Sequence, residues 1–239
     1  MGRIARVVVP GCPHHVTQRG NHRQAVFFSD ADRLTHLRIL ADQCHKHQLR
    51  ILAWCQMTNH VHLIAVPVHN LSLALAMGRA HNDYARWVHI QNRQTGHLWQ
   101  NRFYSCPLDN RHVWDAILYV ETNPVRAGLV KTPTDWPWSS ARAHLSGDDP
   151  FGLLDLNWWR AECPAARRSD WWDNALSLGF SGANILERIR EATRTGRPFG
   201  DTHFTLAIER RLGRSLLPQK RGPKPKSLPA QAQMSFGIS

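Results

Sequence analysis

Two histidines separated by one apolar residue offer the first chemistry in this sequence. His60 and His62 lie in the run 57–64, whose composition predicts a β-strand. Successive side chains of a strand point to opposite faces, so the two imidazoles share one face and Val61 points to the other. Two imidazoles at this spacing can hold one divalent cation. In a chain with 15 histidines, a hydrogen-bonded surface pair is the alternative interpretation.

A second stretch, residues 115–129, adds a tyrosine and an amide. It begins with a helical pattern, and Tyr119 and Asn123 are four residues apart, which places them on one helical face. A tyrosine hydroxyl is a nucleophile and an amide oxygen is a ligand, so this pair complements the two histidines. Pro124 follows Asn123 directly, and we therefore expect the helix to end or bend there.

The elements that must position these residues alternate between strands and helices. The patterns predict strands at 14–19, 49–56, 60–67 and 97–108, with a turn at 57–59, and helices at 29–47, at 71–92 and from 115. Strand–helix–strand repeated twice predicts an α+β fold of the ferredoxin-like type, an antiparallel sheet with helices on one face. Tyr104 is a competing nucleophile, but we disfavour it because it lies on a predicted strand, without a ligand one helical turn away.

Three motifs together carry a resemblance to a known family. They are His14-His15-Val16-Thr17-Gln18-Arg19-Gly20-Asn21, Met57-Thr58-Asn59-His60-Val61-His62-Leu63 and Tyr119-Val120-Glu121-Thr122-Asn123-Pro124-Val125-Arg126-Ala127-Gly128-Leu129. In this order, over about residues 1 to 145, the chain resembles the REP-associated tyrosine transposases of bacteria, which belong to the HUH single-tyrosine nucleases of the IS200/IS605 type. The resemblance implies the HUH nuclease fold, which is ferredoxin-like.

The resemblance also implies a reaction and its residues. His60, His62 and Asn123 would bind Mg²⁺ or Mn²⁺, and Tyr119 would attack a phosphodiester to give a 5′-phosphotyrosine link and a free 3′ hydroxyl. The substrate would be single-stranded DNA that carries a hairpin, such as a REP palindrome. The residues expected to contact this DNA are Arg19, Asn21, His22, Arg23, Arg102, Arg126, Lys220, Arg221 and Lys224.

Two other functions stay open on the sequence. The first is a DNA-binding regulator of the same fold that no longer cuts, which metal-dependent cleavage would contradict. The second is a zinc-dependent hydrolase that uses His60, His62 and another histidine or aspartate. Such a hydrolase would cleave without a protein–DNA adduct, and its activity would survive Tyr119→Phe.

Composition and charge narrow the class of protein. The net charge of +12 and the pI of about 10.4 predict a polyanionic partner. The five cysteines are widely spaced and odd in number, which argues against a disulfide framework or a structural zinc site. No apolar run is long enough to span a membrane, and the first residues lack a signal-peptide pattern. We therefore expect a cytoplasmic, nucleoid-associated protein without membrane partners, and we expect a monomer.

The sequence suggests three parts. Residues 1–146 carry the catalytic motifs, residues 147–212 form a helical extension expected to contact DNA, and residues 213–239 form a basic tail. Within the extension, helices at 183–195 and 202–212 flank a turn rich in glycine and proline. Such a pair fits either a helix-turn-helix on duplex DNA or a hairpin that braces the domain. The tail lacks acidic residues and is expected to be disordered.

Overall fold

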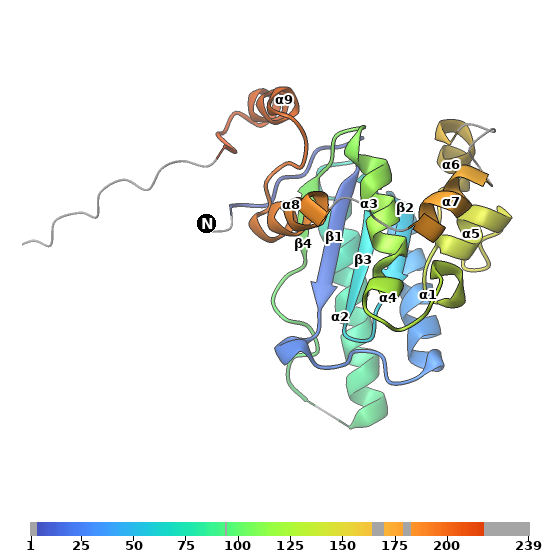
Figure 1. Ribbon diagram of the computed structural model, residues 1–239. Coiled ribbons are helices and arrows are strands. Elements are labelled where there is room, and N and C mark those ends of the chain that lie inside the picture. Colours follow the sequence, from blue (N-terminus) through green and yellow to red (C-terminus); the bar gives the residue numbers. More distant parts are fainter. Residues whose placement is uncertain (1–3, 94, 164–169, 179–182, 218–239) are drawn as a thin grey trace, which may run out of the picture.

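The chain folds around a four-stranded antiparallel sheet. Figure 1 shows the computed structural model, which describes residues 4–93, 95–163, 170–178 and 183–217. The strands lie in the order β2–β3–β1–β4, and every neighbouring pair is antiparallel. Their bounds are β1 (His14–Arg19), β2 (Leu49–Gln56), β3 (His60–Pro67) and β4 (Tyr104–Pro107). With one helix after β1 and another after β3, this is the predicted ferredoxin-like arrangement.

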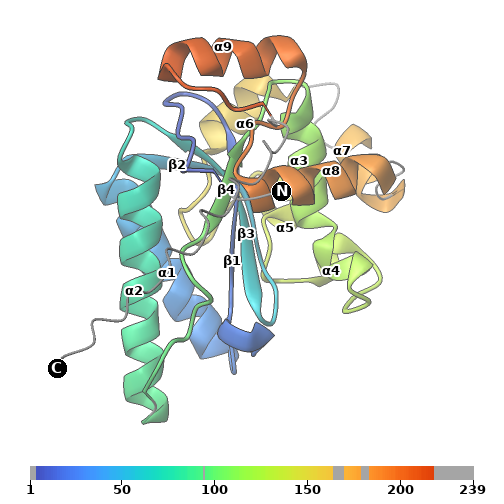
Figure 2. The same ribbon diagram turned by 90° about the vertical axis from the view of Figure 1, so that its left-hand side faces the viewer.

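Two long helices, α1 (Asp30–Lys46) and α2 (Ser72–Asn92), pack on the same face of the sheet (Figure 2). α1 begins at the predicted position because Ser29 and Asp32 form a reciprocal capping box. Leu37 of α1 and Leu73 of α2 share a buried apolar cluster with Val16 of β1. The predicted helical stripe and the predicted strand alternation therefore meet in one core.

The later helices lie on the opposite face of the sheet (Figure 2). They are α3 (His112–Glu121), α4 (Asn123–Arg126), α5 (Ala141–Ser146), α6 (Leu156–Glu162), α7 (Asp170–Leu178) and α8 (Ala183–Thr195). Ile64 of β3, Ile117 of α3, Trp159 of α6 and Ile189 of α8 belong to one hydrophobic cluster, so the predicted extension shares its core with the sheet. In the described part of the chain, no helix has both the length and the apolar character needed to cross a membrane.

The last two described helices pack against the sheet and against the segment that precedes it. α8 packs against β4 and β1, and α9 (Thr202–Leu212) packs through Ile208 on Val7 and Val9 near the start of the chain. Both helices have the bounds predicted from sequence. Of the two interpretations of this pair, the bracing hairpin matches the packing.

One predicted element is much shorter in the structure. Of the expected strand 97–108, only Tyr104–Pro107 forms β4. Trp99 still bridges to Gly20, but Asn101 adopts a left-handed backbone with φ of 57°, which interrupts the strand. Alternation along an unbroken strand 97–108 predicts one side for Leu98, Gln100, Arg102 and Tyr104. This prediction is wrong, since Leu98 and Arg102 line a different cavity from Gln100 and Tyr104.

Both outer strands of the sheet are covered by segments from later in the chain. Along β2, the Gln56 N–H donates to the Trp138 carbonyl and the Ser140 N–H donates to the Trp54 carbonyl. Along β4, the Phe199 N–H donates to the Pro107 carbonyl at 2.8 Å. The connector after the short 3₁₀ helix η2 (Pro133–Asp135) and the α8–α9 turn thus complete the sheet at its two sides.

Candidate active site

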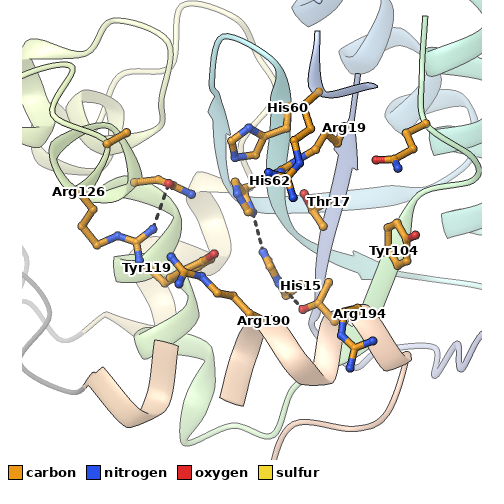
Figure 3. Close-up of a pocket in the computed structure, with 15 residues that line it drawn as sticks. His15, Thr17, Arg19, His60, His62, Tyr104, Tyr119, Arg126, Arg190 and Arg194 are labelled. Atoms are coloured by element: carbon orange, nitrogen blue, oxygen red, sulfur yellow. Dashed lines mark hydrogen bonds between the residues drawn. The ribbon is translucent and has the colours of Figure 1, made fainter. Parts of the chain in front are cut away.

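A cavity of about 550 Å³ opens on the α3 side of the sheet (Figure 3). It is lined by residues from β1, β3, β4, α3, α4 and α8 and from two adjoining loops: His15, Thr17, Arg19, Arg23, His60, His62, Gln100, Tyr104, Tyr119, Asn123, Arg126, Ala127, Arg190, Thr193 and Arg194. The lining contains five arginines and, among the described residues, no aspartate, glutamate or cysteine. Such a cavity favours an anionic ligand.

The floor of the cavity comes from the paired strands β1 and β3. The register sets Thr17 opposite His62 and Arg19 opposite His60. The histidines share the face that points toward α3, whereas Val61 packs on the α2 side of the sheet, as the alternation predicted. The two rings lie with their centroids 4.9 Å apart and nearly perpendicular, at 77°.

The proton of His60 has a defined place. The Asn59 amide nitrogen donates to the Arg23 carbonyl at 2.8 Å, so the amide oxygen must face the other way. That oxygen lies 2.7 Å from His60 Nδ1 and accepts its proton. Burial, with the nearby charges of Arg19 and Arg126, lowers the pKa of His60 to about 3. The ring is therefore neutral at pH 7, and Nε2 carries a free lone pair.

His62 is held by two residues that sequence reasoning did not assign to the site. Its Nδ1 lies 2.9 Å from His15 Nε2, and the two rings are nearly coplanar, at 9°, with centroids 5.2 Å apart. His15 Nδ1 lies 2.7 Å from the hydroxyl oxygen of Thr193 on α8. Burial lowers the pKa of His15 to about 3 and that of His62 well below its usual range, so both rings are neutral at pH 7.

The Tyr119 ring lies nearly perpendicular to the rings of both His15 and His62, 5.5 Å from each centroid. Its side chain is only 3% exposed. The Arg126 guanidinium lies over the tyrosine ring, 4.4 Å from its centroid, and Nη2 donates to the Asn123 side-chain oxygen at 3.0 Å. Arg126 therefore connects the candidate nucleophile to the candidate amide ligand.

Tyr104, the competing hydroxyl, reaches the same cavity from β4. Figure 3 shows it on the far side of the histidines from Tyr119. It is paired in register with Thr17 of β1, whereas Tyr119 comes from α3, where the helix ends just before Pro124. The predicted end of the helix is thus observed, with α3 stopping at Glu121 and α4 starting at Asn123.

Several donors at the cavity wall lack a protein partner. Nε and Nη1 of Arg126 and the side-chain nitrogen of Asn123 are buried, and no hydrogen-bond partner for them occurs among the described residues. Burial lowers the pKa of Arg126, and its interaction with Tyr119 offsets part of this effect. Unpaired buried donors are costly, and an anion with several oxygens would satisfy them.

The other residues predicted to contact DNA are distributed unevenly. Arg19, Arg23 and Arg126 line the cavity. Asn21 and His22 lie in the 3₁₀ helix η1 (Asn21–Arg23) at its rim, outside the lining. Arg102 lines a separate cavity of about 600 Å³ beside α2. Lys220, Arg221 and Lys224 lie outside the described residues.

α8 supplies three lining residues that local sequence patterns could not place at the site. Arg190, Thr193 and Arg194 are three and four residues apart, so they lie on one helical face. That spacing was visible in the sequence, but nothing in it indicated that this face docks beside β1 and β4.

Residues 8–123 match the family model described as "Transposase IS200 like". Over these residues, just under half of its length, the chain has the sequence pattern of the IS200-like transposases. A "REP-associated tyrosine transposase" of Escherichia coli (strain K12) is 26% identical over 148 residues, which cover 58% of this chain and 78% of the relative. A "Putative REP-associated tyrosine transposase" of Haemophilus influenzae is 25% identical over 128 residues, 47% of this chain and 73% of the relative.

A solved structure has the same fold as this chain. It is described as a REP-associated tyrosine transposase bound to a REP hairpin, and it aligns with a TM-score of 0.53 and 22% identity over 66% of this chain and 91% of its own. The predicted family and fold class are therefore confirmed. The family match ends at residue 123, so Arg190, Thr193 and Arg194 of the cavity lie beyond it.

Proposed function

We propose that this protein cleaves and rejoins single-stranded DNA through a covalent link to Tyr119. The observation that carries the proposal is the position of Tyr119, edge-on to His62 in a cavity lined by five arginines. A buried hydroxyl among cations is suited to attack a phosphodiester, because the cations stabilise negative charge on both reactants.

The donor set fits a divalent cation, for which we propose Mg²⁺ or Mn²⁺. His60 and His62 are neutral, and His60 Nε2 is free because its proton lies on Nδ1. Asn123 would be the third ligand, since its oxygen accepts one hydrogen bond from Arg126 and keeps a second lone pair. Such a cation, when bound, polarises the scissile phosphate.

A zinc site built from three histidine, cysteine or carboxylate ligands has less support. No group of three such side chains able to hold a metal occurs in the described part of the chain. The nearest third histidine, His15, directs its Nε2 at His62.

The chain's own residues account for the chemical step. The Tyr119 oxygen bonds to phosphorus as its proton leaves to water, and the bond from phosphorus to the 3′ oxygen breaks. The 3′ oxygen then takes up a proton. Arg126 and Arg19 lie where they stabilise this charge, and both interact electrostatically with Tyr119. The phosphotyrosine bond keeps the energy of the phosphodiester, so a 3′ hydroxyl can reverse the step without a nucleotide cofactor.

Single-stranded DNA that carries a REP-like hairpin is the proposed substrate. The net charge of +12 and the arginine-lined cavity fit a polyanionic strand. The relatives are REP-associated transposases, and the structural neighbour was solved with a REP hairpin.

The test is a denaturing gel of a hairpin oligonucleotide labelled at its 3′ end, incubated with protein and Mn²⁺. The 3′ label stays on the fragment that a 5′-phosphotyrosine link would retain. We expect a slowly migrating adduct with wild type and with Tyr104→Phe, which removes the competing hydroxyl from the same cavity. Tyr119→Phe and His62→Ala should give no adduct.

Two other outcomes would replace the proposal. Cleavage that survives Tyr119→Phe without an adduct would identify a hydrolase. Tight binding without cleavage of any hairpin would identify a DNA-binding regulator of the same fold.

A further inference from the structure

His62 is connected to α8 by a continuous series of hydrogen bonds. The Thr193 hydroxyl lies 2.7 Å from the Ile189 carbonyl oxygen, one helical turn earlier. His15 Nδ1 lies 2.7 Å from the same hydroxyl, and His15 Nε2 lies 2.9 Å from His62 Nδ1. The side chains of His15, His62 and Thr193 are all buried.

Only one direction of donation satisfies every contact. A carbonyl oxygen cannot donate, so the Thr193 hydroxyl must donate to Ile189. That hydroxyl has a single proton, and it must therefore accept from His15 Nδ1. A neutral imidazole holds one proton, so His15 Nε2 accepts from His62 Nδ1, and His62 Nε2 is left with a lone pair.

The remaining contact of Thr193 agrees with this direction. The Cys106 thiol lies 3.3 Å from the Thr193 oxygen and can donate to its second lone pair. With one donation and two acceptances, the Thr193 hydroxyl is fully used. It has no spare capacity to reverse its role toward His15.

We propose that His15 and Thr193 are positioning residues that hold His62 in its metal-binding tautomer, so that α8 completes the metal site. This rests on the proposed function, in which His62 is a ligand. Partners behind metal-binding histidines commonly fix the tautomer and ring orientation, and their loss weakens metal affinity about 10- to 100-fold. Here the last partner comes from a helix beyond the family match at residues 8–123.

α8 supplies a matched control for the test. Thr195 is as buried as Thr193, at 2% exposure, and its hydroxyl also donates to the carbonyl one turn earlier, Glu191, at 2.8 Å. Thr195 belongs to no hydrogen bond of the series that ends at His62. Thr193→Val and Thr195→Val therefore remove the same group from the same helix, and only the first removes the acceptor of His15.

The first measurement is the tautomer of His62 in the full-length, metal-free protein. Long-range ¹H–¹⁵N correlation spectra of histidine-labelled protein separate protonated from unprotonated ring nitrogens, and His62→Gln identifies the signal. Wild type, Thr193→Ser and Thr195→Val should show protonated Nδ1 and free Nε2. Thr193→Val should show a mixture of the two tautomers, because His15 no longer has an acceptor that selects one.

The second measurement is Mn²⁺ affinity, from loss of the free-ion signal in electron paramagnetic resonance. Thr193→Val should bind Mn²⁺ about tenfold more weakly than wild type, whereas Thr193→Ser and Thr195→Val should bind nearly as tightly. An unchanged tautomer and affinity in Thr193→Val would overturn the proposal. Equal losses in both valine variants would reduce Thr193 to a packing residue and also overturn it.

The two measurements separate this proposal from the proposed function. Wild type that binds Mn²⁺ and forms the adduct, but carries the His62 proton on Nε2, would contradict the positioning role alone. Wild type with free Nε2 that binds no Mn²⁺ would contradict the metal-dependent function and leave the hydrogen-bond direction in place.

Discussion

Helix α3 contributes to two buried polar clusters that differ in whether the protein satisfies their hydrogen bonds. Around Tyr119, Arg126 and Asn123 keep buried donors at the cavity wall that have no hydrogen-bond partner in the described part of the chain. Two residues farther along the helix, Glu121 is fully buried, and its carboxylate accepts three hydrogen bonds. These come from the Ser140 hydroxyl at 2.5 Å, His144 Nδ1 at 2.6 Å and Trp172 Nε1 at 3.0 Å.

The difference distinguishes a structural site from a ligand site. The Glu121 carboxylate is satisfied within the protein, and its three partners connect α3 to α5 and α7, which fixes the helix that presents Tyr119. The donors near Tyr119 have no partner among the described residues, so a ligand that enters the cavity can satisfy them. Residues two apart on a helix point about 200° apart, so one short helix serves both purposes on opposite sides.

Glu121→Gln tests the structural side of this comparison and has the largest expected effect. The neutral amide offers one acceptor and two donors where three donors converge, so we expect the free energy of unfolding to fall by about 3 kcal/mol. Urea titration monitored by tryptophan fluorescence measures the change. Glu191→Gln, at an exposed ion pair with Arg194, should change it by no more than about 0.5 kcal/mol. An equal, small effect of both variants would contradict the structural role of the Glu121 cluster.

Arg126→Gln tests the ligand side. In the proposed mechanism Arg126 stabilises charge on the scissile phosphate, so its removal should slow single-turnover cleavage about 100-fold. The free energy of unfolding should fall by only about 1 kcal/mol, because the variant loses the Nη2 hydrogen bond to Asn123 and the contact with the Tyr119 ring, whereas Nε and Nη1 have no hydrogen-bond partner among the described residues. Rapid-quench kinetics with the labelled hairpin and urea titration of the same sample measure both quantities. A large loss of unfolding free energy with an unchanged cleavage rate would show that Arg126 stabilises the fold and does not act on the ligand.

Acid should destabilise the protein through histidines that are buried without charge. Burial lowers the pKa of His14 to about 4, although its hydrogen bond to the Cys12 carbonyl acts in the other direction. Between pH 6.5 and 4 the unfolded chain binds more protons, so stability is lost as the pH falls, by about 1.4 kcal/mol per pH unit for this residue. His14→Gln should reduce the slope of unfolding free energy against pH by that amount. A slope unchanged by this variant would contradict the assignment.

The smallest expected effect concerns the salt dependence of DNA binding. If Arg190 contacts a phosphate from the cavity wall, Arg190→Gln should lower the slope of log affinity against log salt concentration by about 0.7 for a single strand. Arg50→Gln is the control. Arg50 lies on β2, at the opposite edge of the sheet from β4, and forms an ion pair with Asp155. Fluorescence anisotropy across a KCl series measures both slopes, and equal slopes for the two variants would place Arg190 outside the interface.

Local patterns in the sequence predicted most of the sheet and the facing histidines. The capping residue Ser29, the alternation around His62 and the proline at 124 each act over a few residues, and each prediction agrees with the structure. The strand predicted at 97–108 is shorter in the structure, Tyr104–Pro107, because the left-handed backbone at Asn101 interrupts a run whose composition is typical of a strand.

The rest of the site depends on contacts between distant segments. His15 was visible as a strand residue, but its partner Thr193 lies 178 positions away, and no local pattern links them. Likewise, the sequence assigned no role to Glu121, because its partners on α5 and α7 become neighbours only after the chain has folded. Local periodicity places side chains on faces of elements, whereas the docking of α8 decides which faces meet.

The covered edges of the sheet have a consequence for any shortened form of the protein. A fragment ending at residue 123, where the family match stops, would lack the Trp138, Ser140 and Phe199 segments that pair with β2 and β4. It would present two rows of unpaired backbone groups, which are templates for strand addition from other copies. Such a fragment should self-associate during expression. Its insolubility would result from the exposed strand edges and would say nothing about catalysis.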